Sequence, residues 1–503
     1  MSQKEIKEAF VSNLNGTTLG EISLGSALAP LCLLSRGLGL ILYFLGKGVF
    51  PFPWKVHLLL DFTVVVLPLI LSCTVLSDAL HVVIVSLAAF DASMLFRVYH
   101  RRKHSPAVPF RRIFKDFLGS SLETDRVPFV TVFRVLVNVK TAISILAVDF
   151  AIFPRRYAKS ETYGTGVMDF GVGAFILANS LVCPEARRKQ SPPSKFAHLT
   201  KQLLSVWPLV ALGLARLLSV KATGYHEHVS EYGVHWNFFF TLAIVRAVAS
   251  LLLSVFPVNR SWLLAVIIGG SYQAALELTD LKSFILNGSD RTGGFVSANR
   301  EGVFSVIGYV AIYMAGVQVG LHVMESRMVV KDWIKAIARL LLGSFALWAV
   351  LFVCQMFVEP VSRRMANLSF GIWTVAQSLY FLCCLSAADL VLAFAKFLSN
   401  CRSVSSSWSP SQAPQTQNSD SKSSSVVRKI REDIEGLCLI QAVNRNQLLF
   451  FMLSNIMTGL TNVMVDTIHS SSVFSVFVLV FYMFANSFIV YVLHLQRITV
   501  KFW

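Results

Sequence analysis

Residues 128–183 read PFVTVFRVLVNVKTAISILAVDFAIFPRRYAKSETYGTGVMDFGVGAFILANSLVC, and this stretch decides the fold. Two apolar segments, 128–149 and 164–183, flank a polar connection at 149–166. Stretches of about twenty apolar residues are long enough to cross the hydrocarbon core of a bilayer. The pattern therefore predicts two membrane-spanning helices with charged residues between them at the membrane edge. Charges there are costly, so by default they indicate a functional site.

The rest of the chain repeats this pattern. Its 503 residues are 54% hydrophobic and 15% charged, which is too apolar for an average soluble protein. The polar N-terminus lacks the pattern of a cleavable signal peptide, so the first span is expected to direct insertion. The sequence predicts an all-α polytopic membrane protein with about 13 transmembrane helices. The predicted spans are 23–45, 56–77, 79–97, 128–149, 164–183, 202–220, 236–256, 261–279, 302–324, 336–356, 367–392, 446–468 and 472–494.

The loop charges predict the orientation. With these spans the termini lie on opposite faces, and the loops on the face of the C-terminus hold most of the Lys and Arg residues. Basic loops are retained in the cytoplasm, so the N-terminus is expected to be lumenal and the C-terminus cytoplasmic. The net charge of +17 then reflects topology and attraction to anionic lipid, and not nucleic-acid binding.

Five regions are expected along the chain, and one of them is a serine-rich loop that cannot bury enough apolar surface to fold. The regions are a lumenal segment at 1–22, the core helices 1–11 at 23–399, the disordered cytoplasmic loop at 400–445, helices 12 and 13 at 446–494, and a cytoplasmic tail at 495–503.

Unusual polar motifs fall on the predicted lumenal face. Bundled helices could bring them around one cavity, although capping of helix ends explains each motif alone equally well. The eight cysteines have neither metal-site nor disulfide spacing. The motifs lie at 13–18, 149–166, 231–237, 298–302, 362–367 and 464–471.

Several of these residues suit general acid–base chemistry. Asp149 is a candidate general base for a hydroxyl group. Lys159 could hold Asp149 ionised, or stabilise an oxyanion or a substrate phosphate. His235 is the next candidate base or proton shuttle, with a structural role as the alternative. Asp466 and His469 are three residues apart and are expected to face each other.

The longest motifs resemble those of the phosphatidylinositol-glycan biosynthesis class W family, the inositol acyltransferases of GPI-anchor assembly, and are most similar to its mammalian members. The resemblance covers essentially the whole chain. In the polar connection at 149–166, only Ala151 and Ser160 depart from the family pattern. The motifs are DFAIFPRRYAKSETYGTGVMDFGVG, EYGVHWNFFFT, SANREGVFSVIGY, SRRMANLSF and LTNVMVDTIHSSS.

The resemblance implies a multi-pass enzyme of the endoplasmic reticulum membrane with its active site towards the lumen. It implies transfer of a fatty acyl group, usually palmitoyl, from acyl-CoA to the inositol 2-hydroxyl of glucosaminyl-phosphatidylinositol, with no permanently bound cofactor or metal. Carried over to this sequence, Asp149 accepts the hydroxyl proton, while Lys159 orients the acid and stabilises negative charge.

Other polar residues of the motifs are expected to bind substrate, since guanidinium groups can pair with phosphates in bidentate geometry. A lipid transporter or flippase, a scaffold without catalysis, and a membrane-bound O-acyltransferase that relies on His235 and Asn237 are the alternatives. No repeat is evident and the motifs gather on one face, which favours an enzyme over a transporter. The expected substrate-binding residues are Arg155, Arg156, Glu161, Asn237, Asn299, Arg300, Arg363, Arg364, Asn367, Asp466 and His469.

Overall fold

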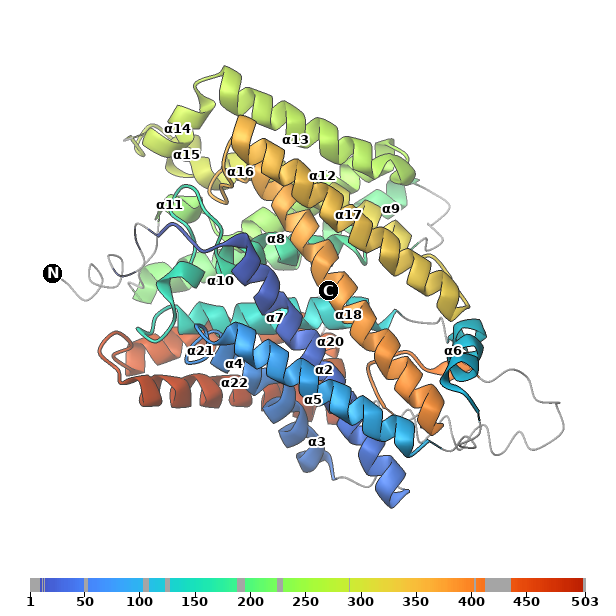
Figure 1. Cartoon of the computed structure of the whole chain (residues 1–503). Helices are drawn as coiled ribbons and strands as arrows, with labels where there is room; N and C mark the ends of the chain where they lie inside the picture. Colours follow the sequence, from blue (N-terminus) through green and yellow to red (C-terminus); the bar gives the residue numbers. More distant parts are fainter. Residues whose placement is uncertain are drawn as a thin grey trace.

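The structure is a computed structural model that describes residues 10, 12, 14–48, 53–102, 108–122, 127–187, 195–223, 229–288, 290–401, 404–411 and 436–500. In these residues the chain forms a bundle of helices, with one pair of two-residue strands. Figure 1 shows the long helices running from one end of the bundle to the other.

The helices begin and end as follows. The first part of the chain contains α2 (Leu19–Lys47), α3 (Trp54–Asp61), a π-helical segment (Phe62–Val66), α4 (Leu67–Ser72), α5 (Leu80–His100), α6 (Phe110–Gly119), α7 (Pro128–Ala147), α8 (Val167–Ser180), α9 (Lys195–Leu204), α10 (Trp207–Thr223) and α11 (Val229–Tyr232). The second part contains α12 (Phe238–Val255), α13 (Ser261–Leu278), α14 (Leu281–Asn287), α15 (Phe295–Ala298), α16 (Arg300–Val323), α17 (Val330–Phe357), α18 (Leu368–Ser399), α20 (Leu439–Arg445), α21 (Gln447–Met464) and α22 (Ser472–Leu495).

Twelve helical stretches of the described residues are long and apolar enough to cross a membrane. They coincide with the predicted spans, apart from the span predicted at 164–183. That span contains α8, which has 14 residues and is about 21 Å long at 1.5 Å per residue. A hydrocarbon core is about 30 Å thick, so the prediction of about 13 full-length spans differs from the structure at this short helix.

Hydrogen bonds between loops show which loops lie together at each of the two ends of the bundle. At the first end, segment 14–18, loop 148–166 and loop 358–367 bond to one another, as in the 2.9 Å bond from the Gly164 N–H to the Val361 carbonyl. At the second end β1 (Ser121–Leu122) pairs with β2 (Pro410–Ser411). In Figure 1 the first end is on the left, where α11, α14 and α15 lie, and α6 marks the second end.

Although α8 is short, the chain changes from the first end of the bundle towards the second end along it. It begins directly after loop 148–166 at the first end, and the chain is back at that end in α11, where Glu231 pairs with Lys159. The chain therefore leaves the first end along α8 and returns to it along α9 and α10. This course is the one that the predicted span at 164–183 requires.

Small residues let α8, α16 and α18 pack closely in the middle of the bundle. A Cβ atom on Gly316 of α16 would collide with the Ser180 hydroxyl of α8, and one on Gly173 of α8 would collide with Thr374 of α18. Such close approach is typical of helix contacts in membranes, where van der Waals packing drives association. It fixes the position of α8, and with it the loop that precedes α8.

Part of the serine-rich stretch differs from the expected solvated loop. Residues 404–410 are mostly buried at the second end, because buried charges satisfy their backbone. The Lys396 ammonium donates to the carbonyls of Val404 at 2.7 Å and Trp408 at 3.1 Å. The Trp408 N–H donates to the Asp389 carboxylate at 2.9 Å. Residues 439–445 were also predicted to be disordered but form α20, which buries Leu439, Ile440, Ala442 and Val443. Residues 402–403 and 412–435 of the predicted loop lie outside the described residues.

Candidate functional site

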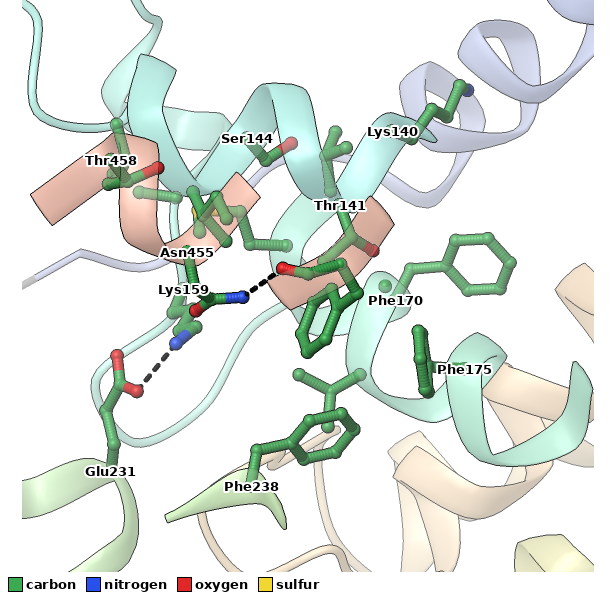
Figure 2. Close-up of a pocket in the computed structure, with 18 of the residues that line it drawn as sticks. Lys140, Thr141, Ser144, Lys159, Phe170, Phe175, Glu231, Phe238, Asn455 and Thr458 are labelled. Carbon is green, nitrogen blue, oxygen red and sulfur yellow. Dashed lines mark hydrogen bonds and ion pairs between the residues drawn. The ribbon is translucent and has the colours of Figure 1, made fainter. Parts of the chain in front are cut away.

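A cavity of about 770 Å³ lies at the first end of the bundle, and α7, α8, α10, α12 and α21 contribute to its wall. Figure 2 shows Phe170, Phe175 and Phe238 on its apolar side and Lys159 with Glu231 on its polar side. The volume is within the range of small-molecule sites, which are mostly apolar with a few placed polar groups. The cavity therefore suits an amphiphile that has an apolar chain and a polar head.

Helix α7 brings Asp149 to this cavity. Thr141, Ser144 and Val148 line the cavity from one face of the chain, because residues three and four apart lie on the same side of a helix. Asp149 follows directly and is buried. Its carboxylate Oδ2 accepts a 2.6 Å hydrogen bond from the Asn462 amide of α21, so a residue late in the chain orients the candidate base.

Lys159 enters the cavity from loop 148–166. Its ammonium lies 2.6 Å from the Glu231 carboxylate of α11, as Figure 2 shows. Burial lowers the pKa of Lys159, the negative charge of Glu231 opposes this effect, and Arg363 lowers the pKa further. The expected ion pair with Asp149 is thus replaced by one with Glu231, while Asp149 and Lys159 still share the cavity.

A second ion pair holds the loop that carries Lys159. The Asp169 carboxylate accepts hydrogen bonds from the backbone N–H groups of Ser160 at 3.0 Å and Gly166 at 2.9 Å. It also accepts one from the Arg363 guanidinium at 2.8 Å, and both side chains are buried. Asp169 therefore ties the end of the Lys159 loop to the start of α8 and to loop 358–367.

Glu359 collects four donors beside the cavity. Tyr163 donates at 2.7 Å, Gln273 at 2.9 Å and Asn367 at 3.0 Å, and the Lys282 ammonium lies at 2.8 Å. Burial acts to raise the pKa of Glu359, but these hydrogen bonds outweigh it and hold the pKa below its usual value. The cluster fixes loop 358–367, and Asn367 in addition accepts the Phe370 N–H as the N-cap of α18.

Glu301 gathers three guanidinium groups. Its buried carboxylate lies 2.7 Å from Arg291, 2.9 Å from Arg364 and 3.7 Å from Arg300. The Arg300 guanidinium also donates to the Gly288 carbonyl. Arg300 and Arg364, both predicted to bind substrate, thus lie at a buried acid of α16.

The sequence model of the GWT1 family matches residues 3–493. The chain belongs to the GWT1 family. Mouse and human proteins, both named glucosaminyl-phosphatidylinositol-acyltransferase PIGW, are each 48% identical to this GWT1-family chain over 100% of both sequences. GPI-anchored wall transfer protein 1 of Aspergillus fumigatus is 35% identical over 95% of each sequence. The resemblance drawn from the motifs is therefore confirmed.

Five of the predicted site residues line the cavity of this GWT1-family chain, namely Asp149, Lys159, Glu161, Asn237 and Arg363. The Glu161 N–H donates to the Leu14 carbonyl at 2.8 Å, so segment 14–18 closes over the loop. The Asn237 side chain accepts the N–H groups that open α12 and donates to the Gly213 carbonyl of α10 at 2.8 Å. Asn237 thus joins two helices of the cavity wall.

Arg155 and Arg156 of loop 148–166 are not among the described residues that line the cavity. Arg155 donates to the carbonyls of Val148, Phe150 and Phe153, and burial lowers its pKa to about 10. Arg156 pairs with Glu21 at 3.1 Å and Asp78 at 2.6 Å. Within the described residues, both arginines therefore stabilise contacts between segments at the first end of the bundle.

His235 lies beside the cavity and is not among the described residues that line it. Its Nδ1 is 3.2 Å from the Lys221 ammonium, and its backbone N–H donates to the buried Asn299 side chain at 2.7 Å. Asp466 and His469 form the expected pair at 2.8 Å, and the hydrogen bond from His469 lowers the pKa of Asp466. Both side chains are exposed, at 55% and 72%.

Sequence reasoning missed Glu231, Asn462, Arg216 and Lys140 of this GWT1-family site. Arg216 and Lys140 carried a signal, because each interrupts a span, and charges at membrane depth usually line a cavity. Both do line it, and the Lys140 ammonium donates to the Gly25 carbonyl of α2 at 2.8 Å. The partnership of Asn462 with Asp149 links residues 313 positions apart, so the motif that contains Asn462 could not indicate this contact.

Proposed function

We propose that this protein transfers a fatty acyl group of palmitoyl length from acyl-CoA to the inositol 2-hydroxyl of glucosaminyl-phosphatidylinositol. The observation that carries the proposal is one cavity with Asp149 and Lys159 on its polar side and phenylalanine rings on its apolar side. Acyl transfer to glucosaminyl-phosphatidylinositol is the activity for which the mouse and human relatives are named.

The reaction needs one proton acceptor and one site for developing negative charge. Asp149 accepts the proton of the 2-hydroxyl while that oxygen attacks the carbonyl carbon of the thioester. The Lys159 ammonium stabilises the oxyanion of the tetrahedral intermediate. When the C–S bond breaks, Asp149 returns the proton to the departing CoA thiolate. The products are the acylated inositol and CoA, and no covalent enzyme intermediate is required.

Two neighbouring residues prepare these groups. The Asn462 amide, 2.6 Å from the Asp149 carboxylate, fixes the orientation of that carboxylate in the cavity. The Glu231 carboxylate opposes the lowering of the Lys159 pKa by burial. In this arrangement Asn462 takes the orienting role that the sequence assigned to Lys159, and Lys159 acts on the oxyanion.

The apolar side of the cavity suits the acyl chain. Phe170, Phe175 and Phe238 line it, and a bound acyl chain there would exclude water from the activated thioester. A multi-pass location in the endoplasmic reticulum membrane, with the cavity towards the lumen, follows from the proposed pathway and from the basic loops at the second end.

Purified full-length protein, assayed for acyl-CoA-dependent acylation of glucosaminyl-phosphatidylinositol, tests the proposal. Asp149→Asn and Lys159→Gln should each reduce kcat by about 10² to 10⁴-fold, which is typical for the loss of a general base or an oxyanion partner. Asp332→Asn and Lys335→Gln are matched controls, because this pair is 3.3 Å apart and exposed on α17. A folded but inactive wild type would overturn the activity, and active Asp149 and Lys159 variants would overturn their roles.

A further inference from the structure

The cavity opens onto the surface of the bundle between α10 and α21. Ile456 and Leu460 of α21 line the cavity and are 54% and 56% exposed. Ala215 and Ser219 of α10 line it from the other side and are exposed as well. Both helices belong to stretches that can cross a membrane, so the opening faces lipid.

Arg216 lies at this opening. It belongs to α10, lines the cavity and is exposed. Its Nη1 donates to the Asn455 side-chain oxygen of α21 at 3.0 Å, which connects the two sides of the opening. Among the described residues, no carboxylate forms an ion pair with this guanidinium. A membrane-embedded arginine whose partner is a neutral amide indicates a place for an anion.

The chemistry of the acceptor indicates which anion. In a phosphatidylinositol the phosphodiester is attached to the ring carbon next to the one that bears the 2-hydroxyl, so phosphate and attacking oxygen are close together. Arg216 lines the same cavity as Asp149 and Lys159, so it lies near the proposed reaction centre. A guanidinium can bind phosphate oxygens in bidentate geometry.

We propose that Arg216 binds the phosphodiester of the glycolipid acceptor as this lipid enters from the bilayer between α10 and α21. The phosphate takes the place of the Asn455 side chain on the guanidinium, and the inositol ring then reaches Asp149. This inference rests on the proposed function, and it assigns the acceptor, and not acyl-CoA, to the lipid-facing opening.

The kinetic test separates the two substrates. Arg216→Gln removes the charge and keeps an amide that can still bond to Asn455. We expect KM for glucosaminyl-phosphatidylinositol to rise about tenfold, equivalent to ~1.4 kcal/mol, while KM for acyl-CoA stays within about twofold. Arg339→Gln is the control, because Arg339 is an exposed arginine of a membrane-spanning helix, α17, away from the cavity lining. An unchanged KM for the glycolipid, or a rise confined to acyl-CoA, would overturn the proposal.

A binding measurement makes the inference independent of turnover. Native mass spectrometry of protein incubated with glucosaminyl-phosphatidylinositol should show less retained lipid on Arg216→Gln than on wild type or Arg339→Gln. If wild type retains the lipid through Arg216 but does not acylate it, the acyltransferase proposal fails and this inference stands. Equal retention by all three proteins would overturn the inference. Should Arg216→Gln fail to fold, Arg216→Lys gives the same test with a rise of about threefold, since a point charge lacks the bidentate geometry.

Discussion

Replacing Asp169 by Asn tests whether the ion pair with Arg363 holds the Lys159 loop. The two side chains are 0% and 3% exposed and 2.8 Å apart. Asparagine can still accept the Ser160 and Gly166 N–H groups, so the main loss is the charge that compensates Arg363. Removing one partner of a buried ion pair costs about 3 to 5 kcal/mol. We expect Asp169→Asn to lower the free energy of unfolding by that amount and to reduce acyl transfer.

The assay is an SDS unfolding titration of the purified protein in mixed micelles, followed by tryptophan fluorescence. The double variant Asp169→Asn/Arg363→Gln removes both charges, and its destabilisation should be smaller than the sum of the single effects by about 2 kcal/mol or more. Asp332→Asn, which alters an exposed pair, should change stability by no more than about 0.5 kcal/mol. Additive single effects, or an Asp169→Asn variant as stable as this control, would refute the reasoning.

Three further predictions concern the cavity, the first end and the orientation. Glu231→Gln removes the charge that raises the pKa of Lys159, so the Lys159 ammonium loses its proton at lower pH. The alkaline limb of the kcat/KM profile should therefore move to lower pH. An alkaline limb that stays in place would contradict the pairing of Lys159 with Glu231. Gly164 has φ +133° and a Cβ there would collide with segment 14–18, so Gly164→Ala should expose that segment to protease, and unchanged digestion would count against the contact. In intact microsomes an impermeant maleimide should label Lys331→Cys and spare Asp290→Cys, two exposed positions at opposite ends; the reverse pattern would invert the orientation.

Matched controls isolate these effects. Glu277→Gln alters an exposed glutamate that pairs with Lys282 at 3.2 Å and should leave the pH profile unchanged. Gly46→Ala adds a methyl group in open space and should leave proteolysis unchanged. Background labelling should be low, since the native cysteines are buried except for the half-buried Cys384.

The sequence could predict the long helices because length and apolar content alone determine whether a segment suits a bilayer. It could not predict how short α8 is, because caps and loop contacts set that helix's ends. The start of α8 is fixed by Asp169, which accepts the Gly166 N–H. The sequence also could not predict the burial of residues 404–410. Their backbone groups form hydrogen bonds with Lys396 and Asp389 of α18, and these contacts form only in the folded bundle.

For the site, the sequence could identify the loop but not the contacts within it. Asp149 and Lys159 were recognisable as charges at a membrane edge, and both line the cavity. Their partners Asn462 and Glu231 come from helices that pack against the loop only in the folded bundle. Arg300 lies 3.7 Å from the buried carboxylate of Glu301, a contact that its sequence motif could not indicate.

The bond between Asp149 and Asn462 spans 313 positions and has a consequence for biosynthesis. A ribosome has produced α7 and the Lys159 loop long before it produces α21. During that interval the nascent chain contains Asp149 but not yet Asn462, whose amide will orient the Asp149 carboxylate. Enzymatic competence can therefore arise only when translation is nearly complete, and chains that terminate before α21 should be inactive however well their earlier helices insert.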